Sequence, residues 1–329
     1  MNILLVLLLI FLLIFQEKSV IPDRQRAMKI LENYSPESFY LMIQYLNAPN
    51  NYQLNGYEIN FNSPVNVDNY IDYSNELTMI NSLPVVIHEV CHGYTNRNIY
   101  SYLKTKDISY TPKVNYDLLY LSPAESILVE KSDVFRTSQM HPSIADSLKS
   151  FRYQTYIYPA SDIGAQLDGA YGLLDEWNAY YHDMRTSMDL YQVYKKIDID
   201  EKFAVLEFLK VANSTHLAYI EFKYYILKYL LYARQSDPEV YYEILANYAF
   251  RQAFTAIDQR FGDLNLKFNA LKTKIIDDFV SRKIMAAEND QYFFLGRSGV
   301  GNFKQEYQRL EIEIQQKEYQ EIIKTIYVN

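Results

Sequence analysis

Two histidines and a glutamate lie close together in an otherwise apolar stretch of the chain. The segment from Val85 to Gly93 contains His88, Glu89 and His92 in the order His-Glu-x-x-His. On a helix, residues four apart lie on one face, so the His88 and His92 imidazoles can bind the same metal ion. Glu89 is one position further round and can reach a water molecule bound to that ion. A zinc hydrolase requires these residue types at this spacing.

The residues before this motif predict the start of the helix that carries it. Ser82 would cap the helix, and Pro84 suits its first turn. The apolar residues 85–87 predict a buried helix, which is where a rigid metal site belongs. The alternative interpretation is a partly buried helix with two histidines that bind no metal.

A hydrolytic zinc site usually has a third protein ligand besides its water molecule. The metzincin continuation needs Gly and His at positions where this chain has Thr95 and Asn98, so that class is excluded. A thermolysin-like pattern would place a Glu roughly twenty residues after the motif. No Glu lies between residues 100 and 120, so this spacing is also absent.

Glu176 is the predicted third ligand. It lies in a segment whose large apolar residues, among them Leu173 and Trp177, have helical spacing. A carboxylate among such side chains is costly unless it is paired, and a metal ion would supply the pairing. The alternative is a glutamate on a solvated helix face. Two other carboxylates stay open as ligands, namely Glu125, which also fits an ordinary capping box, and the less favoured Glu130.

The motif and the distant Glu176 together resemble the gluzincin group of zinc metallopeptidases, which includes thermolysin-like and lethal-factor-like enzymes. The resemblance covers residues 85–93 and 171–184. Glu176 lies 84 residues after His92, an interval longer than those relatives use, and Asp175 stands where they often have Asn. The resemblance implies Zn²⁺ as cofactor, a peptide or protein as substrate, and three metal ligands, His88, His92 and Glu176.

The resemblance also implies roles for other residues. Zinc acidifies its bound water and polarises the scissile carbonyl, while Glu89 takes the proton of the water and passes it to the leaving amine. Such enzymes often use a Tyr or His to stabilise the oxyanion, and Tyr171 is the candidate here. Asp183 returns to the helical face of Glu176 and could orient a zinc histidine, although a surface position is equally open. His182 falls on a different helical face from Glu176. Three further tyrosines compete with Tyr171 for this role, namely Tyr158, Tyr180 and Tyr181. For each of the four, core packing is the alternative interpretation.

Residues 51–61 predict a β-hairpin just before the metal helix. Asn55 and Gly56 are a strong type I′ turn signal, and apolar residues alternate with polar ones after them. The hairpin could offer an edge strand to a peptide substrate, and a purely structural hairpin is an equal alternative.

Helical signals dominate the rest of the chain. One helix is predicted to begin at Ser35, and a long one to cover residues 201–234. Ser236 and Glu239 form a capping-box pattern that would start another, whereas the stretch from Phe303 is ambiguous between strand and helix. We therefore predict a mainly α (α+β) fold, with a zincin-like catalytic domain, a small antiparallel sheet and a helical C-terminal half.

Residues 3–15 form an unbroken apolar run, which is short for a membrane-spanning helix but suits the core of a signal peptide. We predict a signal peptide or short membrane anchor over residues 1–19, a single metallopeptidase-like domain over residues 20–329, and export of the protein. The alternatives within export are a secreted protein, a periplasmic protein and one attached to the membrane through this segment.

The composition limits the classes of function. The net charge of −8 and the lack of basic clusters argue against a nucleic-acid partner. Cys91 is the only cysteine, which excludes an intramolecular disulfide, and it is interpreted as a small buried hydrophobic residue.

The sequence thus predicts an exported zinc hydrolase that cleaves peptide bonds. Two alternatives remain, a catalytically inactive exported helical protein whose structural metal supports partner binding, and a zinc amidohydrolase that acts on a non-protein amide. Metal content and the activity of a Glu89→Gln variant separate these classes. Neither cleavage specificity nor oligomeric state follows from the sequence.

Overall fold

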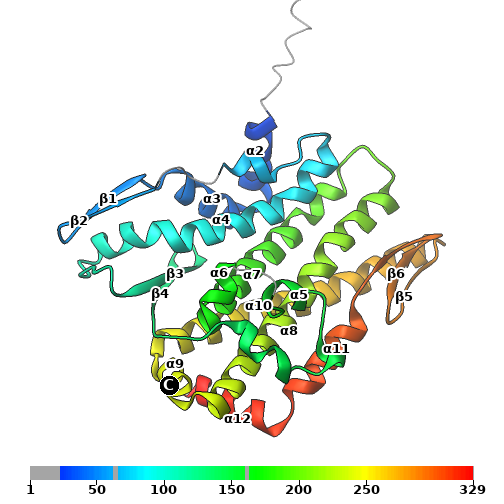
Figure 1. Ribbon diagram of the computed structural model, residues 1–329. Helices are drawn as coiled ribbons and strands as arrows, with labels where there is room; N and C mark the ends of the chain where they lie inside the picture. Colours follow the sequence, from blue (N-terminus) through cyan, green and yellow to red (C-terminus); the bar gives the residue numbers. More distant parts are fainter. Residues whose placement is uncertain (1–22, 62–65, 160–162, 329) are drawn as a thin grey trace, which may run out of the picture.

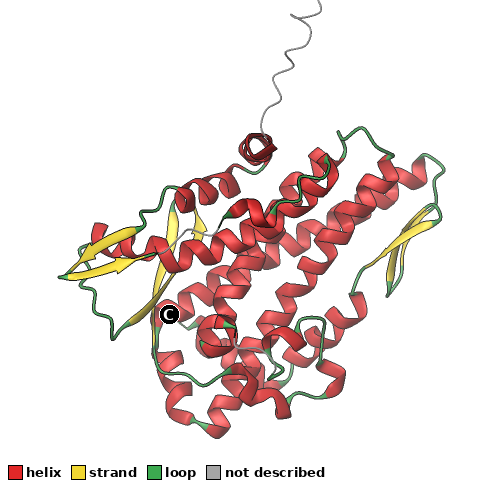
Figure 2. Cartoon of the chain, turned by 45° about the horizontal axis from the view of Figure 1, so that its top comes forward, coloured by secondary structure: helices red, strands yellow, loops and turns green. Residues whose placement is uncertain are grey.

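The computed structural model describes residues 23–61, 66–159 and 163–328. The described part is mostly helical, and its strands form three small antiparallel sheets (Figures 1 and 2). The predicted fold class is therefore confirmed. The predicted signal segment, residues 1–19, lies outside the described residues, and none of the described helices has the length and apolar character needed to cross a membrane.

Four long helices form the body of the molecule, and one of them, α7, packs against the other three, α4, α8 and α10 (Figure 1). Because α7 is apolar on most of its circumference, neighbouring elements cover it on several sides. Buried hydrophobic side chains form one main cluster that reaches from Ala27 to Ile326. The four longest described helices are α4 (Glu76–Thr105), α7 (Gly169–Tyr194), α8 (Glu201–Ser236) and α10 (Tyr248–Ser281).

Shorter helices surround this body. The N-terminal ones are α2 (Asp23–Tyr34) and α3 (Pro36–Leu46). Between α4 and α7 lie α5 (Tyr153–Tyr156) and α6 (Gly164–Leu167), and towards the C-terminus lie α9 (Pro238–Ala246), α11 (Lys304–Ile314) and α12 (Lys317–Tyr327). The 3₁₀ helices are η1 (Val67–Tyr70), η2 (Thr137–Ser143) and η3 (Asp146–Leu148).

Each described strand pairs only with its neighbours in sequence. The predicted hairpin is confirmed as β1 (Asn51–Leu54) and β2 (Tyr57–Asn60), joined by Asn55 and Gly56 at φ of 50° and 85°. Both turn residues have positive φ, as a type I′ turn requires. The second sheet contains β3 (Asn115–Ser122) and β4 (Glu125–Lys131), and β3 packs against α4 and α7. The third contains β5 (Ala286–Glu288), β6 (Tyr292–Leu295) and β7 (Ser298–Gly301).

The helix that carries the motif begins earlier than its sequence predicts. Asn75 caps α4 in a reciprocal capping box with Thr78, so the predicted start at Ser82 is wrong. Pro84 lies inside the helix and has no N–H to donate to the carbonyl of Ile80. Pro84 and Ile80 are both buried, and this packing offsets the loss of one hydrogen bond.

Other predicted helix ends are partly confirmed. Ser35 is the N-cap residue of α3, and α8 covers the predicted long helix. The predicted capping box at Ser236 is wrong, because the side chain of Asp237 caps α9 instead. The ambiguous stretch from Phe303 is helical, because its apolar residues face the core once in each helical turn.

Gly172 allows α6 to approach α7 closely. A Cβ at this position would lie 2.6 Å from the backbone oxygen of Ala165, and a backbone atom cannot move aside as a side chain can. We expect Gly172→Ala to lower the free energy of unfolding by about 1–3 kcal/mol, as overpacked sites do. Urea denaturation measures the change. Gly164→Ala is the control, since no heavy atom lies within 4 Å of its Cβ, and equal midpoints for the two variants would contradict the prediction.

Two buried histidines make the fold sensitive to acid. Burial lowers the pKa of His182 to about 4 and that of His216 to about 3. In the unfolded chain both take up a proton near pH 6.5, so their contribution to stability is full above that pH and is lost as the pH falls. We expect each to cost about 2 kcal/mol of unfolding free energy between pH 6.5 and 5. Denaturant titrations at several pH values test this, and His216→Gln should reduce the slope. An unchanged slope in that variant would refute the assignment.

Candidate metal centre

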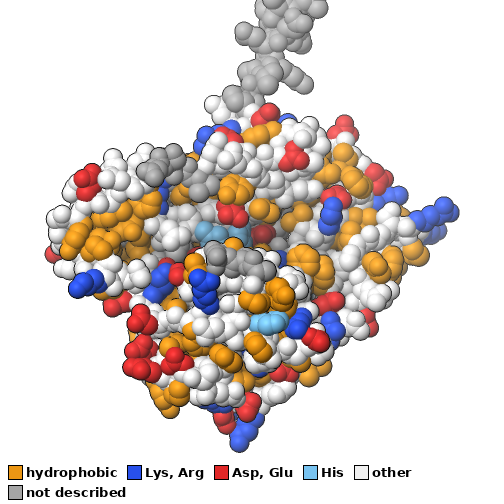
Figure 3. Space-filling view, viewed as in Figure 1, with side chains coloured by type: hydrophobic (Ala, Val, Ile, Leu, Met, Phe, Trp, Pro, Cys, Tyr) orange, Lys and Arg blue, Asp and Glu red, His pale blue; other side chains and the backbone are white. Residues whose placement is uncertain are grey.

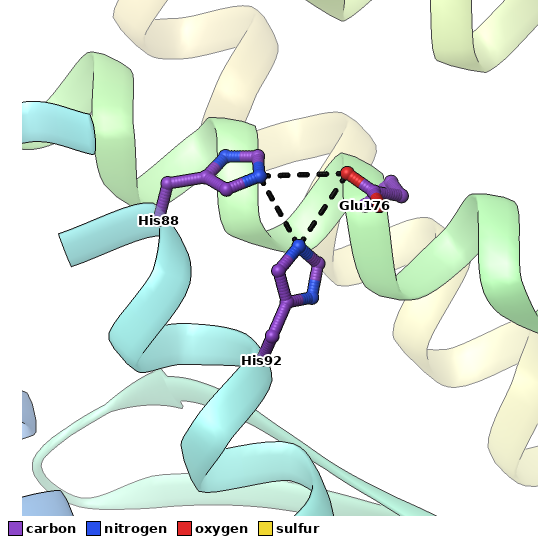
Figure 4. A group of neighbouring side chains, drawn as sticks. All are labelled: His88, His92 and Glu176. Atoms are coloured by element: carbon purple, nitrogen blue, oxygen red, sulfur yellow. Dashed lines mark hydrogen bonds and ion pairs between the residues drawn. The ribbon is translucent and has the colours of Figure 1, made fainter. Parts of the chain in front are cut away.

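Three potential metal ligands meet between α4 and α7 (Figure 4). His88 and His92 project from α4 towards Glu176 on α7. The Nε2 atoms of the two histidines are 3.1 Å apart, and Oε2 of Glu176 lies 3.4 Å from each of them. The fold therefore brings together the three residues that the sequence singled out as ligands.

The separations between these atoms suit a zinc ion. Tetrahedral zinc with bonds of about 2.0–2.1 Å holds its ligand atoms about 3.3 Å from one another. The three measured separations lie close to that value, so one ion fits without rearrangement. Imidazole nitrogen and carboxylate oxygen are also ordinary zinc ligands.

Asp175 fixes the orientation of His92. Its Oδ2 lies 2.6 Å from Nδ1 of His92, and its Oδ1 accepts a hydrogen bond from Thr95 at 2.8 Å. When Nδ1 carries the proton, the lone pair of Nε2 points towards His88 and Glu176. From the sequence, Asp175 is only a departure from the gluzincin pattern. Its position next to the predicted ligand Glu176 was the signal that could have identified this role.

The electrostatics of the site favour positive charge. Burial alone would lower the pKa of His92, but Asp175 and Glu176 more than offset this and raise it well above its ordinary value. Burial would likewise raise the pKa of Glu176, yet His92 and His88 hold it well below its usual range. The negative charges of Asp175 and Glu176 on α7 would therefore stabilise a cation at this position.

Tyr156 on α5 is a site residue that the sequence analysis missed. Its hydroxyl donates to Oε2 of Glu176 at 3.0 Å and lies 3.3 Å from the Tyr180 hydroxyl. Burial and the nearby Glu176 raise the pKa of Tyr156, which keeps its hydroxyl protonated. The Tyr180 ring packs edge-on against His88 with centroids 4.4 Å apart. No sequence signal distinguishes Tyr156 among 33 tyrosines.

Tyr171, the predicted oxyanion donor, is not brought to the cluster. Its hydroxyl lies 3.0 Å from the Ser132 hydroxyl and accepts a hydrogen bond from Asn247 at 3.3 Å. Tyr171 and Glu176 are five positions apart on α7, so their side chains leave the helix on different faces. This placement corrects the assignment of Tyr171.

The other carboxylates considered from the sequence lie elsewhere. Glu125 is paired with Arg260, and Glu130 is exposed on β4, so neither reaches the cluster. Asp183 is buried, and its Oδ1 accepts from Thr215 at 3.2 Å and Ser187 at 3.4 Å rather than from a histidine. The Nδ1 atom of His88 is buried and has no hydrogen-bond partner among the described residues.

His182 and Cys91 are likewise separate from the cluster. The Nε2 atom of His182 lies 2.7 Å from the backbone oxygen of Tyr120. Cys91 is fully buried, as predicted, and Asn178 donates to its sulfur at 3.4 Å.

Two hollows are lined by residues of the cluster. The Glu89 cleft, of about 430 Å³, is lined by His88, Glu89, Val85, Phe151, Arg152 and Tyr180. The Asp117 pocket, of about 240 Å³, is lined by His92, Glu176, Asp175, Asp117 and Asp168. Histidine side chains are visible in a hollow near the middle of the face in Figure 3. The Glu89 carboxylate makes no hydrogen bond or ion pair with any residue the structure describes, so it is free to accept a proton.

The predicted hairpin is not beside the cluster. It contacts the C-terminal half of α4, where the Ser101 hydroxyl lies 3.4 Å from that of Tyr52. The strand nearest the cluster is β3, through Asp117 in the Asp117 pocket. This placement gives no support to the hairpin as a platform for substrate.

Comparison with known proteins adds no relative, since no family model, no curated protein and no solved structure matches the chain. The resemblance to the gluzincin group is therefore limited to the motif on α4 and the glutamate on α7.

The contact between Asp175 and His92 gives a testable prediction. We expect Asp175→Asn to weaken zinc binding about 10–100-fold, because the amide is a poorer acceptor for the His92 Nδ1 proton. Competition titration with a chromophoric chelator measures the affinity. Asp168→Asn is the matched control, since Asp168 lines the same pocket but pairs with Lys131. Equal affinities in the two variants would show that Asp175 does not support the ligand.

Proposed function

We propose that this protein is a zinc-dependent hydrolase, and specifically a metallopeptidase. The observation that carries the proposal is the meeting of His88, His92 and Glu176 at zinc-ligand separations, with Glu89 beside them. Two helices that are far apart in the sequence supply these residues, and the motif alone does not require them to meet.

The residues of the site would have the following roles. His88, His92 and Glu176 would hold the zinc ion, and Asp175 keeps Nε2 of His92 directed at it. When bound, zinc would acidify a water molecule and polarise the carbonyl of the substrate. Glu89 would accept the proton of that water on its free carboxylate and deliver it to the leaving nitrogen.

Tyr156 is suited to assist at the carbonyl oxygen. Its hydroxyl proton points at Oε2 of Glu176, and the whole side chain is buried beside the cluster. Tyr156 also lines the Glu89 cleft, and its proton would turn from Oε2 to the carbonyl oxygen of a bound substrate, where it would stabilise the developing negative charge. Tyr156 thus replaces Tyr171 as the candidate donor.

The shape of the site supports a chain-like substrate. The Glu89 cleft reaches His88, and the Asp117 pocket reaches His92 and Glu176, so a substrate that occupies both would pass over the cluster. Val85 and Phe151 are 46% and 62% exposed in the cleft, and apolar side chains of a peptide would cover them.

The test is metal-dependent hydrolysis by the purified protein. We expect about one zinc per chain, by mass spectrometry of the metal, and cleavage of a quenched fluorescent peptide library. A chelator should stop cleavage, and added zinc should restore it. Protein that binds no zinc, or cleavage that resists the chelator, would refute the proposal. Zinc binding without cleavage of any peptide would favour the inactive protein or the non-protein amidohydrolase.

A further inference from the structure

A third hollow lies away from the metal cluster and is larger than the two beside it. It measures about 660 Å³ and lies between α8, α10 and α11, near the sheet of β5–β7. Helix α8 separates it from the Glu89 cleft, because Thr215 lines that cleft and the next residue, His216, lines this hollow. We call it the polar cavity. In Figure 1, α11 and β5 lie on the opposite side of the molecule from β1 and β2.

Most residues that line the polar cavity have a polar group in the side chain. Of the residues that line it, only Gly262 and Leu266 lack a polar group in the side chain. Several polar side chains are buried in its inner wall, where they are at most 6% exposed, namely His216, Asp258, Asn265, Lys272 and Asn302. Buried polar side chains are costly unless they are satisfied. Asp258, Lys272 and Asn302 have partners within the chain, which leaves His216 and Asn265 to be explained.

Part of this buried wall has unused hydrogen-bonding capacity. The Oδ1 atom of Asn265 and the Nε2 atom of His216 are buried and have no partner among the described residues. Asn265 donates through Nδ2 to the His216 carbonyl at 3.3 Å, which fixes its amide with Oδ1 free. Burial lowers the pKa of His216, so its neutral ring offers one donor and one acceptor nitrogen.

The charge of the cavity disfavours anions. Lys223 pairs with Asp258 and Lys272 pairs with Glu288, at 2.8 Å and 2.7 Å. Asp263 and Glu311 have no ion-pair partner in the part of the chain that the structure describes. Lys304 alone cannot offset both, so a phosphate or nucleotide would meet net negative charge.

We propose that the polar cavity binds an uncharged, hydroxyl-rich ligand of the saccharide class. Each sugar hydroxyl both donates and accepts, and the wall offers carboxylates and amide oxygens beside amide and ammonium donors. Tyr307 stacks on His216 with ring centroids 4.8 Å apart and adds an aromatic surface. The volume lies within the range of about 300–1,000 Å³ that is usual for small-molecule sites. This inference does not depend on the proposed hydrolase activity.

Ligand-observed NMR of the full chain with cellobiose, maltose and chitobiose tests the proposal. We expect saturation transfer from the wild type to at least one of them, at concentrations up to about 10 mM. The double variant Asn269→Ala/Gln308→Ala changes two exposed side chains of the cavity and should weaken binding at least about tenfold. Asn69→Ala, an exposed position on η1, is the matched control and should bind as the wild type does.

Asn265→Ala removes the buried oxygen, and its folding is checked by circular dichroism. If it folds, saccharide binding should be lost, and if it does not, the exposed double variant still decides. Free disaccharides and insoluble cellulose or chitin form separate arms, which distinguish a soluble sugar from a surface polysaccharide. The proposal is overturned if no saccharide binds in either arm, if the double variant binds like the wild type, or if inorganic phosphate binds more tightly.

Discussion

The Glu89→Gln variant is expected to bind zinc like the wild type and to hydrolyse peptides about 10²–10⁴-fold more slowly. The amide has nearly the size of the carboxylate but cannot accept the proton of the attacking water. Glu89 contributes no ligand atom to the cluster, and its carboxylate has no hydrogen-bond partner among the residues that the structure describes, so the fold and the candidate metal site should survive the change. Steady-state cleavage of a fluorescent peptide, with zinc content measured on the same sample, gives both results.

The matched control for this experiment is Glu125→Gln. Glu125 was the main rival as a ligand, and it is exposed and paired with Arg260. Its substitution should leave both zinc content and cleavage unchanged. Peptide cleavage by Glu89→Gln at the wild-type rate would remove Glu89 from the chemistry and would favour a contaminating enzyme.

Glu176→Gln is expected to have the second largest effect, on metal binding. Glu176 is the only ligand supplied by α7, and its Oε2 lies 3.4 Å from both histidine nitrogens. We expect zinc affinity to fall by more than about 100-fold, beyond the usual effect of a residue that only supports a ligand. Zinc competition titrations measure this, and Glu89→Gln is the comparison that should retain the metal. Wild-type affinity in Glu176→Gln would mean that the ion is bound elsewhere.

The three residues of the cluster could be predicted because their signals are local. The spacing of His88 and His92 lies within one turn of one helix, and the apolar periodicity around Glu176 marks it as an unusual carboxylate. Asp175 and Tyr156 were missed for a different reason. Their roles depend on contacts between distant segments, and Tyr156 lies on a four-residue helix that has no periodicity to detect.

Predictions of the fold also succeeded where the signal was local and failed where it was long-range. The hairpin turn at Asn55 and Gly56 was predictable because only certain residues tolerate positive φ at both positions. The start of α4 was not, because Ser82 and Pro84 form a plausible local start, while the packing of the core continues the helix back to Asn75. Local signals compete at helix ends, and long-range burial decides between them.

The packing of α7 against α4 and β3 does not depend on the three ligand side chains. Asn178 and His182 both hold α7 to the backbone oxygen of Tyr120, and Thr186 bonds to Ser38 on α3. We therefore expect these contacts to hold α7 in place before an ion binds. Unlike a zinc finger, which unfolds when stripped of its ion, this protein should remain native as an apoprotein and take up zinc reversibly. Uptake and release of the ion should then require no refolding.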